Sequence, residues 1–137
     1  MKLSLKVEYA CQVLAQLGYT VNTPELPHIE DLAKAEGIPS NYLVQILNEL
    51  RTAGLINSRR GKQGGYALAR PPAEITLHDI MQAVEGNVLA HSQSGTGQSS
   101  QRMSAVWSEV AEKFESTLKS YTVEQVMSRG SEEMWYI

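Results

Sequence analysis

Apolar and polar residues alternate with a helical period over three segments of the first 53 residues. Apolar side chains recur three and four positions apart within each segment, which predicts amphipathic helices. The segments are residues 5–17, 28–36 and 40–53. Ser40 is predicted as the N-cap of the third helix, and Gly54 follows its end. Because only residues 37–39 separate the second helix from the third, the pattern predicts a helix-turn-helix.

The pattern then changes to two short strands. Residues 55–60 and 66–70 are predicted to pair across a glycine-rich turn at residues 61–65. A hairpin that directly follows the second helix of a helix-turn-helix is a wing. A further helix starts at a capping box formed by Thr76 and Asp79. We therefore predict a winged helix-turn-helix DNA-binding domain over residues 1–86, with its wing at residues 55–70.

The C-terminal part has a different pattern. Residues 87–102 contain few large apolar side chains and are expected to form a flexible loop of the sensor type, whereas residues 103–137 are expected to form a dimerisation helix and tail. The long helix has an apolar stripe that needs a partner, either a second copy of the chain or the chain's own first helix. The residues assigned to a homodimer interface are Met103, Val106, Trp107, Val110, Phe114, Leu118 and Tyr121. The fold class is thus mainly α with a small β-hairpin wing.

Charge is unevenly distributed along the chain. The net charge is −3, but residues 1–70 hold eight Lys/Arg and six Asp/Glu (+2), and residues 71–137 hold four and nine (−5). Residues 52–70 contain four basic residues and no acidic one. A local basic region on an acidic protein suits contact with phosphates, although charge alone would equally fit a solvated loop.

Two groups of residues are candidates for contact with double-stranded DNA. Asn and Gln on the exposed face of the third helix can bond adenine edges in the major groove, and Ser and Tyr can contact phosphates. Arginine beside glycine at a wing tip can enter a narrow minor groove. The candidates are Ser40, Asn41, Tyr42, Gln45, Asn48 and Arg51 in the helix, and Ser58, Arg59, Arg60, Gly61, Lys62, Gly64 and Gly65 in the wing.

Other classes of protein fit the sequence poorly. The chain has no phosphate-binding loop, nucleophile elbow or His/Asp/Glu metal set, so we expect no enzyme, no catalytic residue and no metal site. No apolar run is long enough for a membrane span, and charged Lys6 and Glu8 interrupt any signal peptide, so we expect a cytoplasmic protein. The alternative function is a winged domain that binds only proteins, against which the basic wing tip argues.

The sequence resembles the IscR/NsrR/CymR-type regulators of the Rrf2 family. The resemblance rests on YLVQIL at residues 42–47, on RGKQGGYAL at residues 60–68 and on ITLHDIMQAVEG at residues 75–86, and it covers nearly the whole chain. It implies a homodimeric transcription regulator on a pseudo-palindromic site, with the long helices crossing at the interface. It further implies that Asn41, Tyr42 and Gln45 lie in the major groove and that Arg60 and Gly61 lie in the minor groove. We expect a repressor, since a dimer that covers a promoter needs no other contact to block it.

The sequence departs from that family in one respect. Many relatives sense their signal with an iron–sulfur cluster whose cysteine ligands lie in the loop before the Trp-containing helix. Here that loop contains no cysteine, and the chain's one cysteine is Cys11 in the first helix. We therefore expect no cofactor in this chain. Either a partner protein or small ligand supplies the signal, or the loop serines Ser92, Ser99 and Ser100 replace native cysteines, in which case a cluster was lost.

Overall fold

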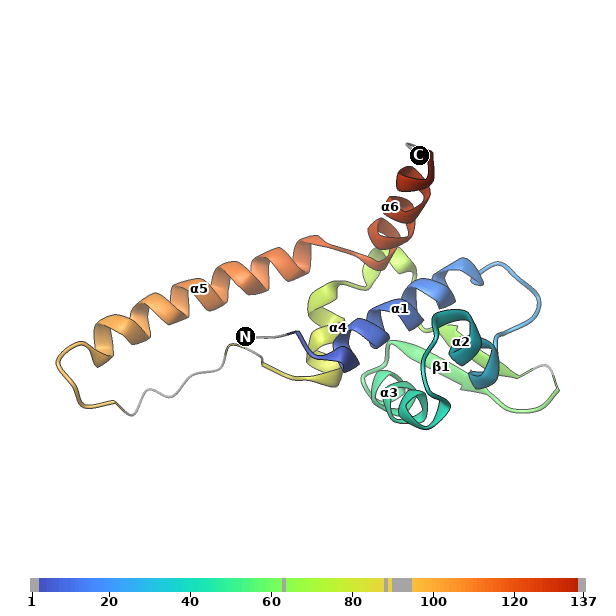
Figure 1. Cartoon of the computed structure of the whole chain (residues 1–137), viewed down its shortest axis with the longest axis horizontal. Helices are drawn as coiled ribbons and strands as arrows, with labels where there is room; N and C mark the ends of the chain where they lie inside the picture. Colours follow the sequence, from blue (N-terminus) through green and yellow to red (C-terminus); the bar gives the residue numbers. More distant parts are fainter. Residues whose placement is uncertain (1–2, 63, 88, 90–94, 136–137) are drawn as a thin grey trace.

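The computed structural model of the chain describes residues 3–62, 64–87, 89 and 95–135. Over these residues three helices lead to a hairpin and a fourth helix, from which a long helix projects before a last helix returns to the domain (Figure 1). They are α1 (Leu5–Tyr19), α2 (Ile29–Glu36), α3 (Ser40–Thr52), β1 (Ile56–Arg59), β2 (Gly65–Leu68), the 3-10 helix η1 (Pro72–Glu74), α4 (Leu77–Val84), α5 (Ser100–Ser120) and α6 (Val123–Trp135). No helix in these ranges combines the length and apolar character that crossing a membrane requires.

The apolar core is organised around α1. The buried face of α1 packs against α2, α3, α4 and α6, because its apolar residues recur at helical spacing. Leu14 and Leu17 on this face are almost completely buried. The other large buried side chains come from the elements around it and are Leu32, Leu43, Ile46, Leu47, Leu50, Leu55, Ile56, Ile75 and Ile80. The helix-turn-helix is therefore part of one continuous apolar core.

The turn between α2 and α3 has the expected glycine. Gly37 has φ +67°, and its left-handed conformation ends α2. The next residue, Ile38, is buried and donates its backbone N–H to the carbonyl of Ala33 at 3.0 Å. The predicted N-cap is displaced by one residue: Pro39 occupies the cap, and Ser40 is the first residue of α3. Proline at this position is compatible with a helix start because its missing N–H has no partner within the helix.

The hairpin is shorter than predicted. Its register pairs Ile56 with Leu68 and Arg59 with Gly65, so the strands span four residues each. The N–H of Tyr66 donates to the carbonyl of Pro27 at 2.9 Å, which attaches β2 to the segment before α2. The sequence pattern predicted no helix or strand for that segment. The segment stabilises the wing, because it supplies a hydrogen-bond acceptor to the edge of a two-stranded sheet, where backbone groups need partners.

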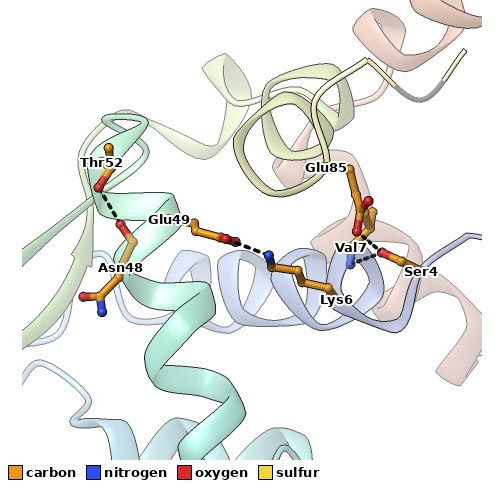
Figure 2. A network of polar contacts seen from close by, with 7 residues as sticks. All are labelled: Ser4, Lys6, Val7, Asn48, Glu49, Thr52 and Glu85. Carbon is orange, nitrogen blue, oxygen red and sulfur yellow. Dashed lines mark hydrogen bonds and ion pairs between the residues drawn. The ribbon is translucent and has the colours of Figure 1, made fainter. Parts of the chain in front are cut away.

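Polar contacts fix the start of α1 against two other helices (Figure 2). Ser4 caps α1 by accepting from the N–H of Val7 at 3.2 Å, and its hydroxyl donates to Glu85 after α4 at 2.5 Å. Lys6 forms an ion pair with Glu49 of α3 at 2.6 Å. These contacts hold α3 in place relative to α1 and α4.

The two C-terminal helices differ from expectation. Helix α5 begins at Ser100, three residues before the predicted start, and the expected tail contains a second helix, α6. Helix α6 begins at a capping box: Thr122 N–H donates to the Gln125 side chain at 2.9 Å, and Gln125 N–H donates to the Thr122 hydroxyl at 3.3 Å. The capping box of Thr76 and Asp79 is likewise present at the start of α4.

Helix α6 belongs to the core of the N-terminal domain and not to a separate C-terminal unit. Val123 is buried, and its N–H donates to the carbonyl of Ile75 at 2.9 Å. Leu77 N–H donates to the carbonyl of Tyr121 at 3.0 Å, so the α5–α6 junction is bonded to the start of α4. The predicted division at residue 103 missed this return, because the pairing joins residues far apart in the sequence.

Candidate DNA-binding surface

The exposed face of α3 carries most of the predicted major-groove residues. Leu43, Ile46, Leu47 and Leu50 are buried on one side of the helix. The opposite side exposes residues three, four and seven positions apart, as a period of 3.6 requires. The residues exposed there are Ser40, Asn41, Val44, Gln45, Asn48, Arg51 and Thr52. Asn41, Gln45 and Asn48 therefore share one surface, as the sequence predicted.

Arg51 joins this helix to the wing. Its guanidinium donates to the side-chain carbonyl of Asn48 at 3.1 Å and to the hydroxyl of Ser58 on β1 at 3.4 Å. The bond to Asn48 uses its amide oxygen, so its NH2 group remains available to donate to a base. Arg51 thus sets the orientation of Asn48 and contacts the first strand of the wing. All three side chains were predicted site residues, and the structure brings them together.

Tyr42 lies at the side of the exposed face. It is half-buried, and its ring meets the ring of Tyr9 of α1 edge to face, with centroids 5.7 Å apart and an interplanar angle of 76°. Edge-to-face packing of this kind stabilises the contact between helices. The position of the Tyr42 ring favours a structural role. It does not support the predicted contact of Tyr42 with bases in the major groove.

The tip of the wing exposes its basic side chains. Arg59, Arg60 and Lys62 are all exposed, and Gly61 between them has φ +97° and open space around its Cα. A positive φ strains other residues, so glycine suits this turn. The tip is closed by a bond from the N–H of Gly64 to the carbonyl of Gly61 at 2.9 Å. Three cations consequently project from one short turn.

Gly64 and Gly65 have a different role from the one predicted. Both are buried, so they do not approach DNA directly. A Cβ on Gly64 would collide with the carbonyl oxygen of Arg59. Gly65 has φ +139°, and a Cβ there would lie 2.6 Å from the carbonyl oxygen of Pro27 and 2.8 Å from the Cβ of Leu26. These glycines therefore allow β2 to approach the backbone of Arg59 and of Pro27 closely, and not the backbone of DNA.

A cleft of about 440 Å³ separates the wing from the start of α2. Its walls carry the three guanidinium groups of Arg51, Arg59 and Arg60, together with the carboxylate of Glu30. The sequence did not single out the α2 side of this cleft. The excess of positive charge makes the junction of helix and wing an electropositive surface suited to phosphate.

The predicted stripe on α5 is divided in two. Phe114, Leu118 and Tyr121 are half-buried, and Phe114 and Leu118 pack against the core of the domain. Helix α5 packs mainly on α4. The sequence left packing on α1 open as an alternative to a second copy, and α1 is not the main contact of α5. In contrast, the first half of α5 projects away from the domain (Figure 1) and exposes its apolar residues by 40–49%. These exposed residues are Met103, Val106, Trp107 and Val110.

The comparisons with known proteins agree with this geometry. A family model described as "Rrf2: Iron-dependent Transcriptional regulator" matches residues 3–129. The chain belongs to the Rrf2 family. A Mycobacterium tuberculosis protein named as a helix-turn-helix-type transcriptional regulator is 41% identical over 97 residues, which cover 71% of this chain and 60% of that protein. The chain therefore spans about three fifths of this curated relative.

Solved structures of other Rrf2-like regulators confirm the fold class. CymR, the global cysteine regulator of B. subtilis, superposes with a TM-score of 0.80 at 27% identity, covering 94% of this chain and 98% of CymR. IscR of T. potens also has a TM-score of 0.80, at 30% identity, covering 97% of this chain and 90% of that one. The predicted family and the mainly helical fold with a small hairpin are both confirmed.

The residues of this Rrf2 chain do not fit an iron–sulfur cluster, although the family's description includes iron. Such clusters take several thiolate ligands, and the only cysteine in the sequence is Cys11. Burial, and secondarily the charge of Glu8, raise the pKa of its thiol to about 11. Among residues that the structure describes, no three His, Cys, Asp or Glu side chains are grouped to hold a metal ion. Ser92 lies outside the described residues, whereas Ser99 and Ser100 lie at the start of α5.

We predict that Gly65→Ala destabilises the domain by about 1–3 kcal/mol, because it adds a strained φ and a clash with Pro27. Urea unfolding followed by circular dichroism measures this change. Gly61→Ala is the matched control, since its Cβ would meet open space and only the strain of φ remains. An equal loss of stability in the two variants would contradict the assigned role of Gly65.

We predict that Cys11 reacts slowly with iodoacetamide at pH 8, since a pKa near 11 leaves only a small thiolate fraction. Mass spectrometry follows the alkylation, and the urea-unfolded chain serves as the fast-reacting control. The raised pKa also favours the protonated folded state, so this contribution to stability is complete below pH 9, the ordinary pKa, and is lost as the pH rises toward 11. Equal alkylation rates in folded and unfolded chains would contradict the assigned burial.

Proposed function

We propose that this chain is a sequence-specific DNA-binding transcription regulator. The observation that carries the proposal is the exposed polar face of α3, joined through Arg51 and Ser58 to a wing with three exposed cations. In winged helix-turn-helix proteins a helix of this kind enters the major groove. The wing lies beside it, where arginine can reach the adjacent minor groove or its phosphates.

The individual contacts follow from the positions of the side chains. Asn41 and Gln45 are exposed on the central surface of α3 and have the bidentate groups that bond adenine. Asn48, oriented by Arg51, donates to a base from its amide NH2 group. Ser40 lies in the first turn of α3, where a hydroxyl and free backbone N–H groups suit a phosphate. At the wing, Gly61 lets the backbone approach DNA while Arg59, Arg60 and Lys62 bind the negative groove.

We further propose that the regulator is a homodimer. The projecting half of α5 exposes four large apolar side chains on one face, and contiguous apolar surface of this kind generally marks an interface. A second copy of the same helix supplies a matching surface through a two-fold axis. Two identical winged domains then read two related half-sites, which accounts for a pseudo-palindromic operator.

The regulation that we propose requires no cluster. Because the chain lacks the thiolates for one, its signal comes from a partner protein or a small ligand. A cleft of about 390 Å³ between α4 and α5, lined by Met81, Phe114 and Glu112 among others, touches both the DNA-binding domain and the long helix. A ligand bound there would bias the position of one relative to the other. We propose repression by promoter occlusion, in the cytoplasm, as its mode of action.

A winged domain that binds only proteins is the competing function. Its interface would not need the cations clustered at the wing tip and in the adjoining cleft. The two functions differ in their dependence on salt, because DNA binding releases counterions from the phosphates and apolar protein contacts do not.

We predict that Arg60→Ala weakens binding to a selected operator by about 1–3 kcal/mol, since an exposed wing-tip arginine would lose a groove or phosphate contact. Fluorescence anisotropy at several salt concentrations measures the affinity and its salt slope. Lys113→Ala is the control, because Lys113 is an exposed cation on α5 that pairs with Glu109. An isotherm unchanged by Arg60→Ala, or binding independent of salt, would contradict the proposal.

We predict that the double variant Val106→Asp, Trp107→Asp is a monomer, because it places two charges on the exposed apolar face of α5. Sedimentation velocity measures the oligomeric state. Phe114 is left intact, since it packs against the domain core and its loss would disturb the fold. Ser116→Asp adds charge to an exposed position on another face of α5 and should remain a dimer. A double variant that stays dimeric would remove this interface.

A further inference from the structure

The reading face of α3 contains one apolar side chain that the fold does not use. Val44 is 47% exposed, and it is the only large apolar residue of α3 that is so exposed. It lies three positions after Asn41 and four before Asn48, directly beside Gln45. Helical geometry therefore places it at the centre of the polar surface.

Val44 does not pack against the core, and no contact among the residues that the structure describes accounts for a valine at this exposed position. Valine has a lower helix propensity than Gln, Glu, Lys or Arg, the polar residues common on exposed helix faces, because its branched Cβ restricts χ1. The other exposed large apolar residues on the described part of the chain lie near the ends of α1, on α5 or on α6. Val44 belongs to none of these surfaces. Its helix faces the proposed ligand, DNA, with Val44 between the residues expected to contact bases.

The major groove offers one apolar group on its base edges, the C5 methyl of thymine. A valine methyl group packs well against it, and the restricted χ1 of valine in a helix holds that methyl in one position. Its polar neighbours Asn41 and Gln45 suit adenine. An apolar group among such residues therefore matches an A·T-containing step, in which adenine and the methyl of a thymine occur side by side in the groove.

We propose that Val44 is a specificity-determining residue that reads the C5 methyl of one thymine in each half-site. The inference rests on the proposed function, because it assumes that α3 enters the major groove. Cytosine at the same position would present no methyl group and would place its N4 amino donor near an apolar side chain. Val44 thus favours thymine both by contact and by leaving a polar competitor unpaired.

The test is a double-mutant cycle that combines removal of the Val44 methyl groups with removal of one thymine methyl group. An operator is first selected from a random duplex library with the wild-type dimer. Each thymine of the half-site is then replaced, symmetrically in both half-sites, by deoxyuridine, which lacks only the C5 methyl. Affinities of wild type and Val44→Ala are measured for every duplex. Val126→Ala, an exposed valine on α6, is the matched control.

We expect one deoxyuridine position to weaken wild-type binding by about threefold to tenfold, the size of burying one or two methyl groups. Val44→Ala should weaken binding to the thymine operator similarly and lose nothing further on the deoxyuridine duplex. Val126→Ala should behave as wild type. The thermal unfolding temperature of Val44→Ala should equal that of wild type or be slightly higher, since the side chain is exposed and alanine favours the helix.

Two other outcomes would overturn the inference, and they are distinguishable. If wild type selects an operator but deoxyuridine costs the same affinity with and without Val44 at every position, Val44 reads no methyl group while the proposed function stands. If wild type selects no sequence at all, the proposed function fails and this inference fails with it.

Discussion

The position of α3 depends on burial of the apolar face of α1. This helix is surrounded by α2, α3, α4 and α6, and side chains such as Leu14 and Leu17 are removed from water by all of them together. Apolar burial of this extent provides most of the stability of a small domain. The ion pair of Lys6 with Glu49 adds direction to it, by fixing where α3 lies along α1 (Figure 2). A recognition helix held on a rigid core can present side chains to DNA in one arrangement.

The wing is constrained from its inner side. A two-stranded hairpin alone is marginally stable in water, and this one has only four residues in each strand. It is stabilised by the bond between Tyr66 and Pro27, which requires glycine at position 65, and by the contact of Ser58 with Arg51. The outer side of the wing can therefore carry the exposed cations Arg59, Arg60 and Lys62, because the hairpin is stabilised by other residues. Within this one hairpin, the inner contacts stabilise the fold and the outer side chains are those proposed to bind DNA.

Helix α5 serves two parts of the molecule at once. Its second half packs on α4 and completes the domain, and its first half presents apolar residues to solvent. The return of α6 onto α1 fixes the far end of α5 to the DNA-binding core through Leu77 and Val123. In the proposed homodimer, a change in the contact between the two α5 helices would therefore move the two winged domains.

The helices, the hairpin, the capping box of α4 and the family could all be predicted from the sequence, because they depend on local periodicity, turn residues and a motif of fixed spacing. The sequence also indicated the polar face of α3 and the basic wing tip, for the same reason. The tertiary structure, in contrast, sets which of these side chains are exposed to a ligand or a partner. It buried Gly64 and Gly65 against the chain, placed Tyr42 against Tyr9, and divided the α5 stripe at Phe114. It also returned α6 to the core and left Val44 exposed. These outcomes result from contacts between residues far apart in the chain, and such contacts cannot be predicted from a local sequence pattern.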